Sequence, residues 1–203
     1  YRSRGLGDVY KRQVQLQVHS TRRTGWSVAN GQIDLAIIGG QLPNDLENLL
    51  QIIPYATDEL ALVLPAKHQL ANKKELLKED LYKLNFVTLD SQSTTRKVVD
   101  KLLKDSGLDI QRLKIEMELN SLEAIKNAVQ SGLGASFLPV VSIERELAAG
   151  TIHKAFVADL EVKRELKLIT NPSRYTSRAS EVFKKNILPQ FASLESPLKQ
   201  MLI

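Results

Sequence analysis

Hydroxyl and amide side chains occur at three points of the chain where a strand is expected to give way to a helix. They are Ser20 and Thr21, then Ser93, Thr94 and Thr95, and then Asn120 and Ser121. The start of a helix carries backbone N–H groups without intrahelical partners and a partial positive charge, so it can hold a carboxylate or a phosphate. Three such turns at one edge of a sheet would form a binding site for a small anion. Ordinary helix capping would also explain each turn singly.

Arginine side chains stand beside two of these turns. Arg22 and Arg23 follow the first turn, and Arg96 follows the second. A guanidinium makes charge-assisted hydrogen bonds to carboxylates and phosphates. These residues therefore strengthen the expectation of an anion site.

Motifs for catalysis or for a metal site are absent from the sequence. It has no nucleophile elbow, no phosphate-binding P-loop and no His-Glu-x-x-His pair, and it has no cysteine. The pair Gly132 and Gly134 follows an expected helix and precedes an expected strand, which is the wrong order for a dinucleotide fingerprint. We expect no enzymatic activity, no metal site and no cofactor.

The elements that must position these residues follow from hydrophobic periodicity and from turn signals. Strands are expected at 14–18, 33–38, 52–64, 85–89, 113–119, 135–138, 152–156 and 160–170. Helices are expected after Ser20 and Thr21, over 73–81, after the turn at 93–95, after Asn120 with Glu123 as its capping partner, over 140–149 and around 179–187. This alternation predicts an α/β fold with a largely parallel sheet.

The chain is expected to form two lobes. Residues 60–160 can close as a strand–helix unit of their own, and the segments on either side of them would pair to form the other lobe. Such a chain leaves one lobe, builds the second and returns. A cleft between two lobes is a common place for a small ligand.

The composition is that of an ordinary soluble domain of 203 residues, with 43% hydrophobic and 25% charged residues. The formal net charge is +5, but residues 1–13 contribute +3 of it, so the rest of the chain carries only +2. The total therefore does not predict nucleic-acid binding. No apolar run is long enough to span a bilayer. Residues 1–13 also lack any packing period, and we expect a foreign or disordered leader there.

Three stretches in order resemble the effector-binding domain of LysR-type transcriptional regulators. They are Gly31–Ile38 (GQIDLAII), Leu60–Pro65 (LALVLP) with His68, and Ala128–Pro139 (AVQSGLGASFLP). The opening Val18–Thr24 (VHSTRRT) and Ile38–Gly40 (IGG) resemble more narrowly the branch of cyanobacteria and plastids that controls the RuBisCO operon. The resemblance covers residues 14–195.

The resemblance implies a two-subdomain, periplasmic-binding-protein-like (type 2) fold. Its divisions would be the leader at 1–13, subdomain I over 14–59, subdomain II over 60–160, the return to subdomain I over 161–195 and a tail at 196–203. The first strand and helix of subdomain I would be missing, and we expect the truncated chain to be less stable than a complete domain. The resemblance implies inducer contacts at Ser20, Thr21, Ile38, Gly39, Ser93, Thr94, Thr95, Arg96, Asn120 and Ser121. We add Arg22 to this predicted effector site because of its charge beside the first turn.

The resemblance further implies an effector-sensing domain for RuBisCO and carbon-fixation genes. The effector would be a small anionic metabolite, either a phosphorylated carbon-fixation intermediate or a nicotinamide nucleotide. DNA would be bound only through a missing helix-turn-helix domain. The chain would be a homodimer, and a tetramer at full length, in the cytoplasm or plastid stroma and away from membranes. The alternatives are a secreted solute-binding protein of a transporter and an enzyme on the same two-lobed fold.

Overall fold

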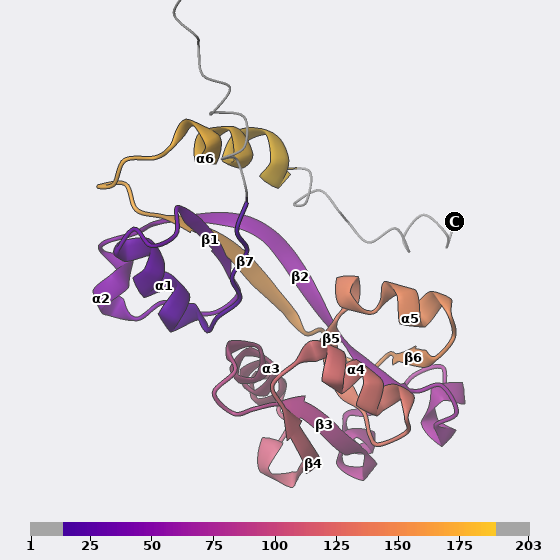
Figure 1. The fold of residues 1–203 in the computed structure, drawn as a ribbon. Coiled ribbons are helices and arrows are strands. Elements are labelled where there is room, and N and C mark those ends of the chain that lie inside the picture. The colour runs from indigo at the N-terminus through magenta and orange to yellow at the C-terminus, as the bar shows by residue number, and fades with distance from the viewer. Residues whose placement is uncertain (1–13, 190–203) are drawn as a thin grey trace, which may run out of the picture.

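The computed structural model describes residues 14–189. The predictions of a leader over 1–13 and of a tail over 196–203 lie outside these residues. Within them, Figure 1 shows two groups of elements joined by two long strands, β2 (Gln51–Pro65) and β7 (Lys163–Thr170). We call these groups the first lobe and the second lobe.

The first lobe contains the elements at the two ends of the described chain. They are α1 (Thr21–Ala29), β1 (Leu35–Ile38), α2 (Asn44–Glu47) and α6 (Arg178–Val182), which continues as the π-helical turn η6 (Phe183–Ile187). The second lobe contains β3 (Asn85–Leu89), α3 (Thr94–Asp105), β4 (Lys114–Leu119), α4 (Leu122–Gln130), β5 (Ser136–Pro139), α5 (Glu144–Ala148) and β6 (Ile152–Ala155). It also holds the 3-10 turns η2 (Gln69–Asn72), η3 (Lys78–Lys83), η4 (Ile110–Arg112) and η5 (Val140–Ser142).

Strand β2 belongs to both lobes. Its first part, Gln51–Glu59, pairs with β7, and its second part, Leu60–Pro65, pairs with β5 and β6. Strand β7 carries β1 on its other side. The two lobes therefore share one five-stranded sheet through β2.

The prediction of a largely parallel sheet is wrong. In the described residues, β1 with β7 and β2 with β5, β6 and β7 are antiparallel, and β3 with β4 is the parallel pair of named strands. The cause is the path of the chain, because β2 leaves the first lobe and β7 returns to it beside β2. Alternation of strands and helices does not reveal this return.

Each lobe has its own apolar core. In the first lobe, Val28 of α1, Leu46 of α2 and Ile169 of β7 pack together and are almost fully buried. In the second lobe, the same faces of α3 and α4 that carry apolar residues at helical spacing lie against β3 and β5, with Leu103 and Ile125 buried. This packing fixes where α1 and α3 begin.

Two predicted elements of the sequence differ in the structure. Residues 14–18 form no strand, and Val14, Leu16 and Val18 are 75%, 88% and 85% exposed. A strand needs a partner for its backbone and for its apolar face, and this segment has none among the described residues. The predicted helix at 73–81 is a loop followed by η3, because Leu76 pairs with Val157 as an isolated bridge instead.

Most of the remaining predicted elements are confirmed with shifts of a few residues. Strand β3 has the predicted bounds, and β4, β5, β6, α3 and α4 lie where the periodicity placed them. The predicted helix over 140–149 is split into η5 and α5 around Ile143. The expected capping pair of Asn120 and Glu123 is wrong, since the N-cap of α4 is Ser121, whose hydroxyl accepts from Ala124 N–H at 3.5 Å.

A candidate anion site at the lobe junction

The starts of α1 and α3 meet where the lobes come together. Thr21 N–H, at the first residue of α1, lies 3.5 Å from Thr94 Oγ1, at the first residue of α3. The N-caps of both helices, Ser20 and Ser93, are extended, and neither side chain makes a capping hydrogen bond. The starts of the two helices therefore lie beside each other across the junction.

The residues that follow β1 at this junction are Gly39 and Gly40, and a side chain at either position would meet a neighbouring residue. A Cβ atom at Gly40 would lie 2.0 Å from Thr94 Cγ2 and 3.2 Å from Thr21 Oγ1. A Cβ at Gly39 would lie 3.2 Å from a guanidinium nitrogen of Arg164. The backbone at Gly39 and Gly40 thus lies close to the junction, and the absence of a side chain at Gly40 leaves room for Thr94.

Arg164 of β7 is a junction residue that sequence analysis missed. Its Nε and Nη2 donate to Asp58 Oδ2 at 2.8 and 2.6 Å, and its Nη1 donates to Thr95 Oγ1 at 2.8 Å. The side chains of Arg164 and Asp58 are 14% and 7% exposed. The sequence holds no local signal for this pair, because Asp58 and Arg164 become neighbours only through the register of β2 and β7.

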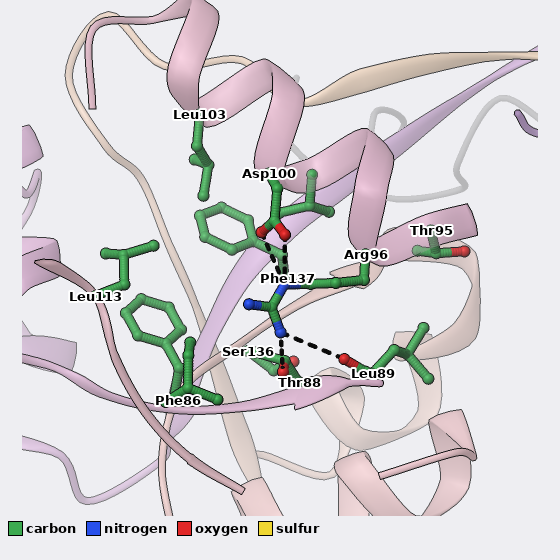
Figure 2. Close-up of a pocket in the computed structure, with 12 residues that line it drawn as sticks. Phe86, Thr88, Leu89, Thr95, Arg96, Asp100, Leu103, Leu113, Ser136 and Phe137 are labelled. Atoms are coloured by element: carbon green, nitrogen blue, oxygen red, sulfur yellow. Dashed lines mark hydrogen bonds and ion pairs between the residues drawn. The ribbon is translucent and has the colours of Figure 1, made fainter. Parts of the chain in front are cut away.

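Arg96 points into the second lobe rather than toward α1. Figure 2 shows its guanidinium beneath α3, bonded to Asp100 and to Thr88 of β3. It also donates to the carbonyl oxygen of Leu89 at 3.3 Å. A cavity of about 30 Å³ beside it, walled by Phe86 and Phe137, is large enough for a single water. The hydrogen bonds and ion pairs of its guanidinium therefore join α3 to β3 and β4 within the second lobe.

The other predicted residues divide between the junction and the surface. Thr21 and Ile38 are buried, and Gly39, Thr94 and Thr95 are partly buried at the junction. Arg22 is exposed on α1. Asn120 is exposed, and the hydroxyl of Ser121 is engaged with its own helix. The structure therefore brings Thr21 and Thr94 together, with Gly39 and Thr95 on either side of Arg164 and with Ser20 and Ser93 at the N-cap positions. Ile38 packs in the core of the first lobe instead.

The arrangement favours binding of an anion over a reaction. It presents backbone N–H groups, hydroxyls and one guanidinium, and these are donors suited to a carboxylate or a phosphate. Within residues 14–189, no group of three or more His, Asp or Glu side chains could hold a metal ion. No helix of that part of the chain is long and apolar enough to cross a membrane.

Comparison with solved structures defines the class of fold. The regulatory domain of CcmR from Synechocystis in complex with 2-PG matches with a TM-score of 0.75 and 23% identity, covering 89% of this chain and 84% of that one. The effector-binding domain of QuiR in complex with shikimate matches with a TM-score of 0.70 and 21% identity, covering 87% and 80%. The fold is the two-subdomain, periplasmic-binding-protein-like α/β fold of such domains.

The family follows from the sequence match. Residues 11–192 match the model of the LysR substrate binding domain, and the chain belongs to this family. A relative from Synechocystis, named probable RuBisCO transcriptional regulator, is 59% identical over 180 residues. That alignment covers 89% of this chain and 52% of the relative, so the chain spans about half the length of the relative.

Proposed function

We propose that the chain is the effector-sensing domain of a LysR-type DNA-binding transcriptional regulator that controls RuBisCO and carbon-fixation genes. The domain binds a small anionic metabolite at the lobe junction. The single observation that carries the site is the meeting of two helix starts, at Thr21 and Thr94, beside the guanidinium of Arg164. The names of the relatives support the regulatory role over the role of a secreted solute-binding protein.

The ligand class follows from the donors at the junction. A phosphorylated carbon-fixation intermediate or a nicotinamide nucleotide carries the phosphate groups that helix starts and arginine prefer. The 2-PG in the CcmR structure supports a small anion as the first ligand to test. Ligand binding would change the relative position of the lobes and, through it, the arrangement of subunits.

The DNA-binding step belongs to a helix-turn-helix domain in the longer protein. Two domains of this kind would form a homodimer, and the longer protein a tetramer. Sedimentation of the chain over a range of concentrations tests the dimer, which should appear as a reversible species of twice the 22.7 kDa chain mass.

The site is tested by replacing its hydroxyls. We expect Thr21→Val and Thr95→Val each to weaken binding of 2-PG, measured by calorimetry, by about tenfold, because each removes a polar partner next to a helix start. Thr170→Val, on β7 and outside the junction, is the matched control. Unchanged affinity in both junction variants would rule out this site.

A further inference from the structure

Arg164 is a residue of β7 whose side chain reaches both lobes. It stands opposite Asp58 in the ladder of β2 and β7, at the point where these strands pass from one lobe to the other. A Cβ at Gly39 in the first lobe would lie 3.2 Å from Arg164 Nη1, and the same Nη1 donates to Thr95 in the second lobe. A change in the position of either lobe must therefore change the contacts of this side chain.

Asp58 occupies only one edge of the guanidinium. The Nε and Nη2 atoms both donate to Asp58 Oδ2, so this edge of the planar group is fixed. A guanidinium has five N–H donors, and the hydrogens at its tip, on Nη1 and Nη2, point away from that edge. At the tip, Nη1 meets the neutral hydroxyl of Thr95.

A carboxylate or phosphate is a better partner for this tip than a hydroxyl is. Hydrogen bonds between an ionised donor and an ionised acceptor are about twice as strong as neutral ones, and a planar fork suits a two-oxygen acceptor. Thr95 is the second residue of α3, so an anion at the start of α3 would lie next to Nη1. The same anion would meet the free backbone N–H groups of that helix.

From these contacts we propose that Arg164 determines the preference of the junction for anions, and that it exchanges its bond with Thr95 for a bond with the ligand. The exchange releases the second lobe from β7 and joins the lobes through the ligand instead. Asp58 holds the guanidinium in place during this exchange and lowers its net attraction for anions. This inference rests on the function proposed above.

The test compares charge variants of one strand by calorimetry with 2-PG and with inorganic phosphate. We expect Arg164→Gln to weaken binding of both probes by about tenfold or more, and Arg164→Lys to retain part of the affinity because it keeps the charge without the fork. Lys167→Gln is the control, because it removes the same charge from the same strand. The Lys167 side chain is 37% exposed and its Nζ lies 3.6 Å from Glu165 Oε2. The affinity of this variant for both probes should stay within twofold of that of the native chain.

Two further variants separate ligand binding from folding. Arg164→Gln leaves Asp58 buried without its partner, so the double variant Asp58→Asn with Arg164→Gln removes both charges and should show the same loss of binding. Asp58→Asn alone should raise the affinity for phosphate, which a purely structural ion pair would not do.

The outcomes distinguish this inference from the proposed function. If Arg164→Gln and the double variant bind 2-PG and phosphate as tightly as the native chain, Arg164 does not set the preference, and the anion site stands without it. If the native chain binds neither probe, the anion site and the role of Arg164 are both wrong.

Discussion

At the scale of single residues, the close approach of the two helix starts depends on the lack of a side chain at Gly40 as well as on Thr21 and Thr94. Gly40 has no Cβ, and a methyl group there would occupy the space of Thr94 Cγ2. Thr94 in turn supplies the hydroxyl that faces Thr21 N–H. One methyl group at position 40 therefore decides whether the two helix starts can touch.

We expect Gly40→Ala to push the two lobes apart and to lower the free energy of unfolding by roughly 1–3 kcal/mol, the usual cost of overpacking. Urea unfolding measures this loss. Combining Gly40→Ala with Thr94→Ser, which removes Cγ2 and keeps the hydroxyl, should restore most of it. A double variant as unstable as Gly40→Ala alone would show that the clash is elsewhere.

A second residue-scale prediction concerns acid stability. Hydrogen bonds from Lys83, at 2.8 Å, and from Leu77 N–H lower the pKa of the Asp80 carboxyl from its ordinary value to about 2. A carboxyl with a lowered folded-state pKa stabilises the fold above its unfolded pKa of about 4, and this contribution is lost as the pH falls toward 2.

We therefore expect Asp80→Asn to destabilise the chain by about 1–3 kcal/mol at pH 7, with the difference from the native chain shrinking between pH 4 and pH 2. Thermal unfolding at a series of pH values measures the difference. Asp105→Asn, at an exposed residue of α3, is the control. A difference that does not change with pH would contradict the role of the carboxylate charge.

At the scale of elements, α4 and α5 are joined by a buried ammonium group. Lys126 Nζ lies 2.8 Å from Glu123 Oε1, 2.9 Å from Glu146 Oε1 and 3.1 Å from the carbonyl oxygen of Ser142. Its hydrogen bonds with Glu123 and Glu146 raise the pKa of Lys126, and the same ammonium lowers the pKa of Glu146. Both groups are therefore charged near neutral pH.

Lys126→Met should lower the free energy of unfolding by about 3–5 kcal/mol, because it leaves the Glu146 carboxylate buried without its counter-charge. The double variant Lys126→Met with Glu146→Met should recover much of this loss, and a double-mutant cycle in urea gives the coupling energy. Lys97→Met on the exposed face of α3 should change stability by less than about 0.5 kcal/mol. Additive losses at Lys126 and Glu146 would argue against the link.

The same scale shows what sequence could and could not predict. Hydrophobic periodicity predicted α3 and α4, because the apolar residues of each helix recur every three to four positions in the sequence. The hydroxyl turns located the two helix starts of the site for the same local reason. The antiparallel return of β7, and with it the pair of Asp58 and Arg164, depends on a register between residues 106 positions apart, which no local pattern encodes.

At the scale of the whole molecule, the lobes are held together at the junction in this structure. If the ligand binds between the helix starts as proposed, its entry requires that they separate. A covalent link across the junction can test this, because the chain contains no cysteine and an added pair would form its only disulfide. A Cβ at Gly40 lies 3.4 Å from Thr94 Cβ, close to the separation of bridged cysteines.

We expect the variant with Gly40→Cys and Thr94→Cys to lose binding of 2-PG when oxidised and to regain it when reduced. Calorimetry with and without a reductant gives both states, and the two single-cysteine variants show whether the substitutions alone affect the site. Equal binding in the oxidised and reduced forms would mean that the ligand enters without separation of the lobes.

The continuity of β2 has a mechanical consequence. Two bodies joined by loops can rotate about a point. A strand of 15 residues that pairs with β7, β5 and β6, with one register shift between Pro54 and Ala56, can only twist or bend. The deformation is then spread over many hydrogen bonds between strands, and the strand bends elastically over a length of about 50 Å. Ligand binding would then change the angle between the lobes gradually rather than in one step. The stiffness of the shared strand β2 would set the force that returns the lobes to their original position.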